Sequence, residues 1–182
     1  MAIQYRVNYQ KAIETVLWLT NKKPGIDIYH IGKVIFYAEK FHLNKYARPL
    51  IGDIYKKGEY GPFPSTIRDI IQQNNRWLDP DHLQESIDAF RVVTEPFLTP
   101  IPKRPANLDF FSKTDIESLS EALEAVGSLT FEELRKLTYE EKSFLSAIEN
   151  GESNYELLIN ENNPLKNEII KEIQETYRYV CV

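Results

Sequence analysis

The chain has 182 residues, of which 42% are hydrophobic and 27% are charged. These fractions match globular proteins, so the composition excludes a disordered chain and predicts a hydrophobic core. No apolar run in the sequence reaches the roughly 20 residues needed to span a bilayer, and the N-terminus lacks the apolar stretch of a signal peptide. The only cysteine, Cys181, has no second cysteine for a disulfide. We therefore expect a cytoplasmic protein without membrane contact.

The net charge of −5 is unevenly distributed. Residues 1–106 contain 15 basic and 11 acidic side chains, a balance of +4, whereas residues 107–182 contain 7 and 16, a balance of −9. An acidic half repels a phosphate backbone and attracts a basic protein surface. The asymmetry therefore favours a protein partner over nucleic acid, although a solvated helical surface would have the same composition.

Two helices are predicted at the N-terminal end. Residues 8–22 form the first, with Asn8 as its cap, and residues 27–46 form the second, opened by Asp27. The second segment is apolar on nearly all sides, which indicates a central helix covered by several neighbours. We expect one exposed ridge on it, made of Lys33, Tyr37, Lys40 and Asn44.

The segment YKKGEYGPFP, residues 55–64, is rich in residues that restrict or widen backbone freedom. It predicts a rigid loop that launches a helix, with Ser65 as the cap. Gly61 is expected to have a conformation or a close contact that a β-carbon would strain. We interpret Gly61, Pro62 and Pro64 as structural residues of this loop.

One small antiparallel ribbon is the only β structure that the sequence predicts. The segment 52–56 would pair with 91–97. Four prolines between residues 96 and 105 then predict an extended connector at about 94–107, outside the core.

The remaining segments are predicted to be helical. Pro80 at the first position favours a helix over 79–90, and Thr130 with Glu133 forms a capping box. The predicted helices are 79–90, 112–128, 129–138, 139–151 and 163–180. The fold class predicted for 1–182 is therefore mostly α (α+β minor), a single compact helical domain with a small antiparallel β ribbon.

No pattern in the sequence predicts catalysis or metal binding. Glu39 and His42 lie one helical turn apart, but no second ligand pair accompanies them, so His42 is interpreted as a hydrogen-bonded residue near the core. Ser65 lies outside any G-x-S-x-G motif, and the glycines form no phosphate-binding loop. We expect no enzymatic activity, no metal and no cofactor; an enzyme would have to use His42 or Asp53.

A basic cluster surrounds the predicted loop. Its members are Lys40, Lys45, Arg48, Lys56 and Lys57, interleaved with Tyr46 and Tyr55. Nucleic-acid-binding proteins show such patterns, and so do ordinary soluble surfaces. A nucleic-acid-binding regulator therefore remains an alternative function.

The stretch HIGKVIFYAEKFHLNKYARPLIGDIYKKGEYGPFPSTIRDII, residues 30–71, resembles the Panacea domain, the SocA-like antitoxin family. The resemblance rests on the helix KVIFYAEKFHL, the turn RPLIGD and the loop YGPFP, and it continues more weakly through residues 118–144. This chain departs from the family pattern at Ala47 and Lys57. It also has Tyr139 and Phe144 where the family has a histidine and a tryptophan.

The resemblance implies an antitoxin of bacterial or phage origin that neutralises a cognate toxin, encoded beside it, by direct binding. Alternatives are an adaptor that delivers the toxin to a cellular protease, and a phage or prophage regulator that binds nucleic acid. Self-association of the chain also stays open. Aromatic residues are enriched at interface anchors, so the predicted toxin-binding surface includes residues of the loop and of the helical ridge. It consists of Lys33, Tyr37, Lys40, Tyr55, Lys57, Tyr60 and Phe63. The acidic helices after residue 112 are the alternative surface.

Overall fold

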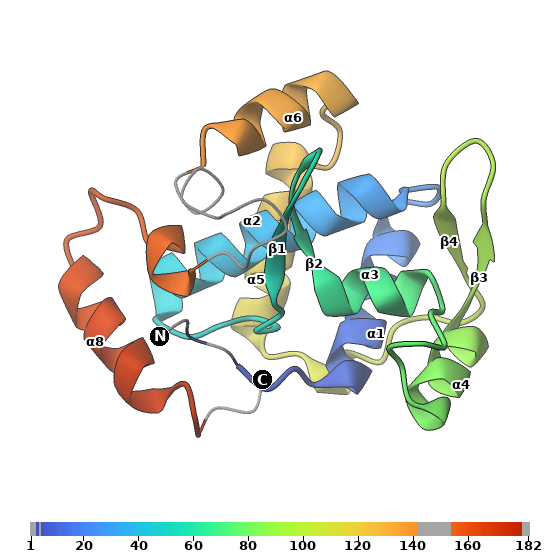
Figure 1. The fold of residues 1–182 in the computed structure, drawn as a ribbon, viewed down its shortest axis with the longest axis horizontal. Coiled ribbons are helices and arrows are strands. Elements are labelled where there is room, and N and C mark those ends of the chain that lie inside the picture. The colour runs from blue at the N-terminus through green and yellow to red at the C-terminus, as the bar shows by residue number, and fades with distance from the viewer. Residues whose placement is uncertain (1–2, 4, 142–153, 180–182) are drawn as a thin grey trace.

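Helices dominate the fold, and two small antiparallel sheets complete it, as the sequence predicts for the class (Figure 1). The computed structural model describes residues 3, 5–141 and 154–179. The helices are α1 (Tyr9–Lys22), α2 (Ile28–Tyr46), α3 (Ser65–Ile71), α4 (Pro80–Ala89), α5 (Lys113–Val126), α6 (Phe131–Tyr139) and α8 (Lys166–Thr176). The strands are β1 (Tyr55–Gly58), β2 (Gly61–Pro64), β3 (Phe90–Val93) and β4 (Thr99–Pro102), and two 3₁₀ turns are η1 (Leu108–Phe110) and η2 (Tyr155–Leu158).

Helix α2 runs through the middle of the molecule (Figure 1). The side chain of Asp27 accepts a hydrogen bond from the backbone N–H of His30 and so begins the helix where the sequence predicts it. Residues Ile31 to Glu39 of this helix are all buried, and α5, β2 and α3 pack against it. The apolar character of α2 on nearly all sides therefore reflects its place between several neighbours.

The helix starts agree with the local capping signals. Ser112 and Thr130 each form a capping box, with Asp115 and Glu133 as the respective third helical residues. Asn8 caps α1 in the same way as Asp27 caps α2, by accepting a backbone N–H. These interactions involve only neighbours in sequence, which is why sequence reasoning places the helix starts correctly.

The predicted pairing of 52–56 with 91–97 is wrong. Instead, β1 pairs with β2 across the two-residue turn Glu59–Tyr60, and β3 pairs with β4. Each strand thus pairs with the next one along the chain, which closes a much shorter loop than the predicted pairing would. The predicted connector contains β4, whose Pro100 is buried, so this segment is a strand over Thr99–Pro102.

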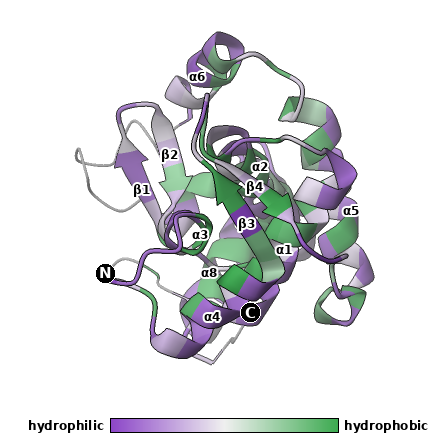
Figure 2. Cartoon of the chain, turned by 90° about the vertical axis from the view of Figure 1, so that its right-hand side faces the viewer, coloured by the Kyte–Doolittle hydropathy of each residue, from purple (hydrophilic) through white to green (hydrophobic). Residues whose placement is uncertain are grey.

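The core is one hydrophobic cluster that draws on most of the described elements. It extends from Ile3 to Ile173 and includes Tyr155 of η2. Figure 2 shows hydrophobic colouring in the middle of the molecule, on α1 and α2, and mainly hydrophilic colouring on β1. No helix of the described residues is long and apolar enough to cross a membrane.

Of the two helices predicted after residue 138, the structure describes one. The helix predicted over 163–180 is present as α8, which ends earlier, at Thr176. Most of the helix predicted over 139–151 lies outside the described residues, and so does Phe144.

Candidate functional site

The segment YKKGEYGPFP forms a β-hairpin, where the sequence pattern predicts a loop. Tyr55 pairs with Pro64 and Gly58 with Gly61, which leaves Glu59 and Tyr60 as the turn. The prolines of β2 do not break the hairpin, because a two-stranded sheet consists of edge strands and such strands tolerate proline.

Gly61 fits against two other elements where a side chain would not. Its φ is +96°, in the region that favours glycine. A β-carbon at this position would lie 2.7 Å from Nζ of Lys33 on α2 and 2.7 Å from Oγ1 of Thr138 on α6. The predicted conformational restriction of Gly61 is therefore confirmed.

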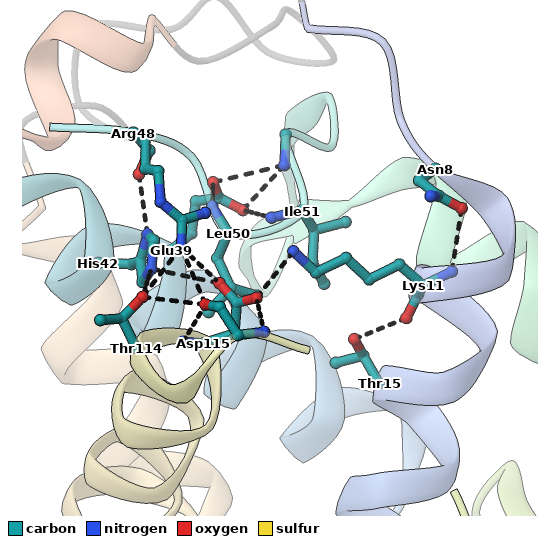
Figure 3. A network of polar contacts seen from close by, with 12 residues as sticks. Asn8, Lys11, Thr15, Glu39, His42, Arg48, Leu50, Ile51, Thr114 and Asp115 are labelled. Atoms are coloured by element: carbon teal, nitrogen blue, oxygen red, sulfur yellow. Dashed lines mark hydrogen bonds and ion pairs between the residues drawn. The ribbon is translucent and has the colours of Figure 1, made fainter. Parts of the chain in front are cut away.

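A buried carboxylate fixes the turn that precedes the hairpin. Oxygens of Glu39 accept backbone N–H bonds from Leu50 at 2.8 Å, from Ile51 at 3.1 Å and from Gly52 at 3.2 Å. Figure 3 shows this carboxylate beside Leu50 and Ile51. The hydroxyl of Tyr55 donates to Glu39 as well, at 3.2 Å. Glu39 thereby connects α2 to the RPLIGD turn and to the first residue of the hairpin.

A second buried carboxylate fixes the helix that follows the hairpin. Asp53 accepts the backbone N–H groups of Thr66 and Ile67, both at 2.9 Å. Burial raises the pKa of Asp53 to about 6, although these hydrogen bonds act in the opposite direction. The prediction that Ser65 caps α3 is wrong. The N-cap position is Pro64, which makes no side-chain cap bond, and Asp53, which precedes the hairpin, accepts N–H groups of the first helical turn instead.

The hairpin covers a pocket of about 310 Å³ between itself, α2 and α3. Almost all of its exposed lining is apolar. The lining residues are Ile28, Tyr29, Gly32, Lys33, Gly58, Glu59, Tyr60, Gly61, Pro62, Phe63, Pro64, Ile67, Arg68 and Gln72. We call this the hairpin pocket. It brings together six residues that the sequence pattern singles out, namely Lys33, Tyr60, Gly61, Pro62, Phe63 and Pro64.

Lys33 is the unusual member of the lining. Its side chain is almost completely buried, and its Nζ donates a hydrogen bond of 2.8 Å to the carbonyl oxygen of Pro62. The ammonium also lies 5.1 Å from the centre of the Tyr29 ring. Burial lowers the pKa of Lys33 to about 7. Within the described part of the chain, no carboxylate lies within 4 Å of this ammonium.

Aromatic side chains continue the apolar surface from the pocket toward α6. The ring of Phe131 lies 4.5 Å from that of Tyr29 and 5.4 Å from that of Tyr60. Tyr60 is 46% exposed and Phe131 is 37% exposed. Tyr139 of the same helix donates a hydrogen bond to the backbone oxygen of Glu59. Helix α6 therefore lies against the hairpin turn, as Figure 1 shows.

The predicted exposed ridge on α2 is wrong for two of its residues. Lys33 and Tyr37 are buried, and β2 of the hairpin packs against this helix. Lys40 is half-buried and forms an ion pair of 2.6 Å with Glu141. Asn44 donates to the backbone oxygen of Leu158, so it binds the C-terminal segment.

Of the four other predicted contact residues, two line the pocket and two do not. Tyr55 is 1% exposed and belongs to the core, so it cannot contact a partner on the surface. Lys57 is partly exposed on β1 and does not line the pocket. Tyr60 and Phe63 both line it, and the guanidinium of Arg68 lies 4.6 Å from the centre of the Phe63 ring.

His42 belongs to a buried network that joins α1, α2 and α5 (Figure 3). Its Nδ1 donates to the carbonyl oxygen of Arg48 at 2.9 Å, and its Nε2 lies 3.3 Å from Asp115. Lys11 lies 3.1 Å from the same carboxylate. Burial acts to raise the pKa of Asp115, but hydrogen bonds from His42 and Ser112 and the charge of Lys11 outweigh it and lower the pKa. The predicted structural role of His42 is confirmed by these contacts.

Sequence reasoning missed the contributions of Tyr29, Gly32, Phe131 and Arg68 to this site. Gly32 lies in the interior of a strongly apolar helix, where glycine is unfavourable, and that was the available signal. A β-carbon at Gly32 would lie 3.4 Å from Cδ of Pro64, so the hairpin packs closely on this residue. The other three residues carry no local signal, because they meet only through the fold.

A family model described as antitoxin SocA-like, Panacea domain, matches residues 31–144, which is more than half of the chain. The chain belongs to this family. Comparison with curated proteins and with solved structures gives no match.

The Panacea match includes most of the hairpin pocket. Of the lining residues, only Ile28 and Tyr29 precede the matched range. The matched range also contains Glu39, Asp53 and Asp115, so the buried acids that fix the hairpin and its neighbours are part of the Panacea region. Among the described residues, no group of three or more His, Cys, Asp or Glu side chains is arranged to hold a metal ion.

Proposed function

We propose that this Panacea-domain protein is an antitoxin that neutralises its cognate toxin by direct binding and without catalysis. The observation that carries the proposal is the family match over residues 31–144. The family's name supplies the antitoxin function, and the hairpin pocket with its exposed aromatic rim supplies a surface suited to a protein partner.

The surroundings of the histidines support a binding function over an enzymatic one. His30 pairs with Asp27 and contacts the backbone oxygen of Leu129. His82 pairs with Asp79 and stacks on a tyrosine ring. His42 has the buried partners described above. Each histidine thus has structural partners that explain its presence without a catalytic role.

The ion pairs of the basic cluster weaken the nucleic-acid alternative. Lys40 pairs with Glu141, and Lys45 pairs with Glu117 and Glu121. Arg48 lies 3.4 Å from Asp115. Three members of the cluster are therefore neutralised by carboxylates of the acidic half, which reduces their attraction for phosphates.

Expression of the neighbouring gene, alone and together with this chain, tests the proposal. We expect the neighbour alone to arrest growth and co-expression to restore it, with the two proteins purifying as a complex. A harmless neighbour, or toxicity that persists on co-expression, would contradict the proposal. If the toxin level falls only in cells with an intact protease, the adaptor alternative replaces simple neutralisation.

A further inference from the structure

We propose that the hairpin pocket is the anchor site for the toxin, and that the toxin segment which enters it presents an apolar side chain beside a carboxylate. This inference rests on the proposed antitoxin function. It adds the chemistry of the segment that is bound and the residue, Lys33, that recognises its charge.

A carboxylate is the group that best complements the charge of the Lys33 ammonium. An ammonium has three N–H donors, and among the described residues the only hydrogen bond of the Lys33 ammonium goes to the carbonyl oxygen of Pro62. The other cation of the lining, Arg68, already lies 3.6 Å from Asp69. A buried charge without a counter-ion is unfavourable, so a carboxylate placed beside Lys33 would both bind and relieve this unfavourable burial.

The size and lining of the pocket fit an apolar side chain. A volume of about 310 Å³ is at the lower end of the range of roughly 300–1,000 Å³ seen for ligand pockets. Ile67, Phe63 and Pro62 supply apolar walls, and Gly32 lines the helical side. Tyr29 also lines the pocket, and its buried hydroxyl has no hydrogen-bond partner among the described residues.

The rim favours a protein segment over a free small carboxylic acid. Tyr60 at the edge of the pocket and Phe131 beside it remain substantially exposed, and their rings lie against each other. A small acid inside the pocket would leave these aromatic surfaces in water. A protein segment anchored in the pocket would cover them, as expected for aromatic residues at the centre of an interface.

Two matched probes test the charge recognition on the full chain. We expect 3-phenylpropionate to shift the backbone amide NMR signals of Gly58 and Gly61 at pH 6, and to bind about tenfold or more tightly than 3-phenylpropanamide, which has no charge. Equal affinities would overturn the role of the carboxylate. If neither probe shifts these signals, the pocket is not a binding site and the inference is overturned.

The same titration at pH 9 identifies the responsible group. The other ionisable groups of the lining are Tyr29, Tyr60, Glu59 and Arg68. The pKa of Tyr29 is raised to about 12, so its hydroxyl does not change charge between pH 6 and pH 9. We expect the preference for the acid to be lost at pH 9 and in Lys33→Met at pH 6. A preference retained in Lys33→Met would assign the charge recognition to another residue and overturn the role of Lys33.

An assay of toxin neutralisation tests whether the toxin occupies the pocket. Gln72 is exposed at the pocket, so Gln72→Trp should obstruct the pocket with little effect on folding; Gln84→Trp, on exposed α4 outside the lining, is the matched control. We expect Gln72→Trp and Lys33→Met to lose neutralisation while Gln84→Trp retains it, with thermal unfolding checked for each. Retention by all three would overturn the pocket as the toxin anchor and leave the antitoxin function intact. Failure of the wild type would overturn both, and the probe titration would still report whether the pocket binds carboxylates.

Discussion

Nζ of Lys33 donates a hydrogen bond of 2.8 Å to the carbonyl oxygen of Pro62, and this bond joins the central helix to the hairpin. A lysine in such a position brings a charged group into an almost fully buried place. The interaction therefore has two effects on stability, a favourable hydrogen bond and an unfavourable burial of charge. Their balance depends on pH.

Lys33 should make the protein more stable as the pH rises above 7. Its pKa is about 7 in the folded state and 10.5 in the unfolded chain, so between these values the unfolded chain binds the additional proton. Below pH 7 the unfavourable burial of charge is fully present. We expect the free energy of unfolding of the wild type, relative to Lys33→Met, to increase by about 2 kcal/mol from pH 7 to pH 9. Urea unfolding at both pH values measures this, and an unchanged difference would refute it.

Gly61→Ala should be more destabilising than Gly25→Ala. Both glycines have positive φ, +96° and +81°, so each substitution should cost about 1 kcal/mol of backbone strain. Only at Gly61 does the new β-carbon also meet Lys33 and Thr138, whereas at Gly25 no atom of the described residues lies within 4 Å. We expect an additional loss of about 1–2 kcal/mol at Gly61, measured by thermal or chemical unfolding. Equal losses would show that the hairpin moves away from α6 without resistance.

Glu39→Gln should destabilise the turn before the hairpin. The carboxylate accepts hydrogen bonds from the backbone N–H groups of Leu50, Ile51 and Gly52. A glutamine has an NH₂ group in place of one carboxylate oxygen, so it would place N–H donors against some of these backbone N–H groups. We expect a loss of about 2–4 kcal/mol in the free energy of unfolding. Glu59→Gln, at an exposed turn position, is the control and should change it by less than about 0.5 kcal/mol. A similar, small effect for both variants would mean that the turn does not depend on Glu39.

Asp115 should contribute to stability at neutral pH and lose that contribution in acid. Its folded pKa is lowered below the ordinary value of 3.8, so its contribution is present above pH 4 and falls as the pH decreases below that value. We expect Asp115→Asn to lose about 3 kcal/mol at pH 7, because Lys11 then lacks its carboxylate. The difference from the wild type should shrink below pH 4. Exposed Asp109→Asn is the control, and a pH-independent difference for Asp115→Asn would contradict this account.

Charge reversals on α6 and at the residue after it test the alternative acidic surface. Glu133 is unsuitable because it forms the capping box with Thr130, so its reversal would disturb the helix. Glu132 and Glu140 are exposed, and we expect Glu132→Lys with Glu140→Lys to leave toxin binding within about threefold of the wild type. A larger loss in a folded variant, measured by titration calorimetry, would move the interface to the acidic half of the chain.

The features that sequence reasoning predicts are those determined by neighbours in sequence. Asp27 and Thr130 begin their helices as predicted, because each cap bonds an N–H three residues ahead. The predicted pairing of β1 is wrong, since strand propensity does not specify a partner. The competing short turn at Glu59–Tyr60 lacks the Asn-Gly or Asp-Gly pair that most clearly marks a hairpin turn.

Burial at the candidate site could not be predicted in the same way. The spacing of Lys33 and Tyr37 on α2 places them on one side of the helix, but it does not show that both are buried and that the hairpin packs against the helix. The pocket itself is formed by segments that meet only after folding, and Phe131 is the clearest example. The composition of the loop did indicate the place, because Gly61 and Pro64 both lie close to residues of α2.

The hydrophobic cluster extends beyond the residues that match the family. Helix α1 precedes residue 31, and Tyr155 and Ile173 follow residue 144, yet all contribute to the same core. The hydroxyl of Tyr155 donates to the backbone oxygen of Asp53, immediately before the hairpin. Tyr155 does not line the pocket, yet through this bond it supports the backbone that leads into the hairpin. Exchange of the segment after residue 144 between relatives should therefore change the geometry of the pocket while every lining residue stays the same.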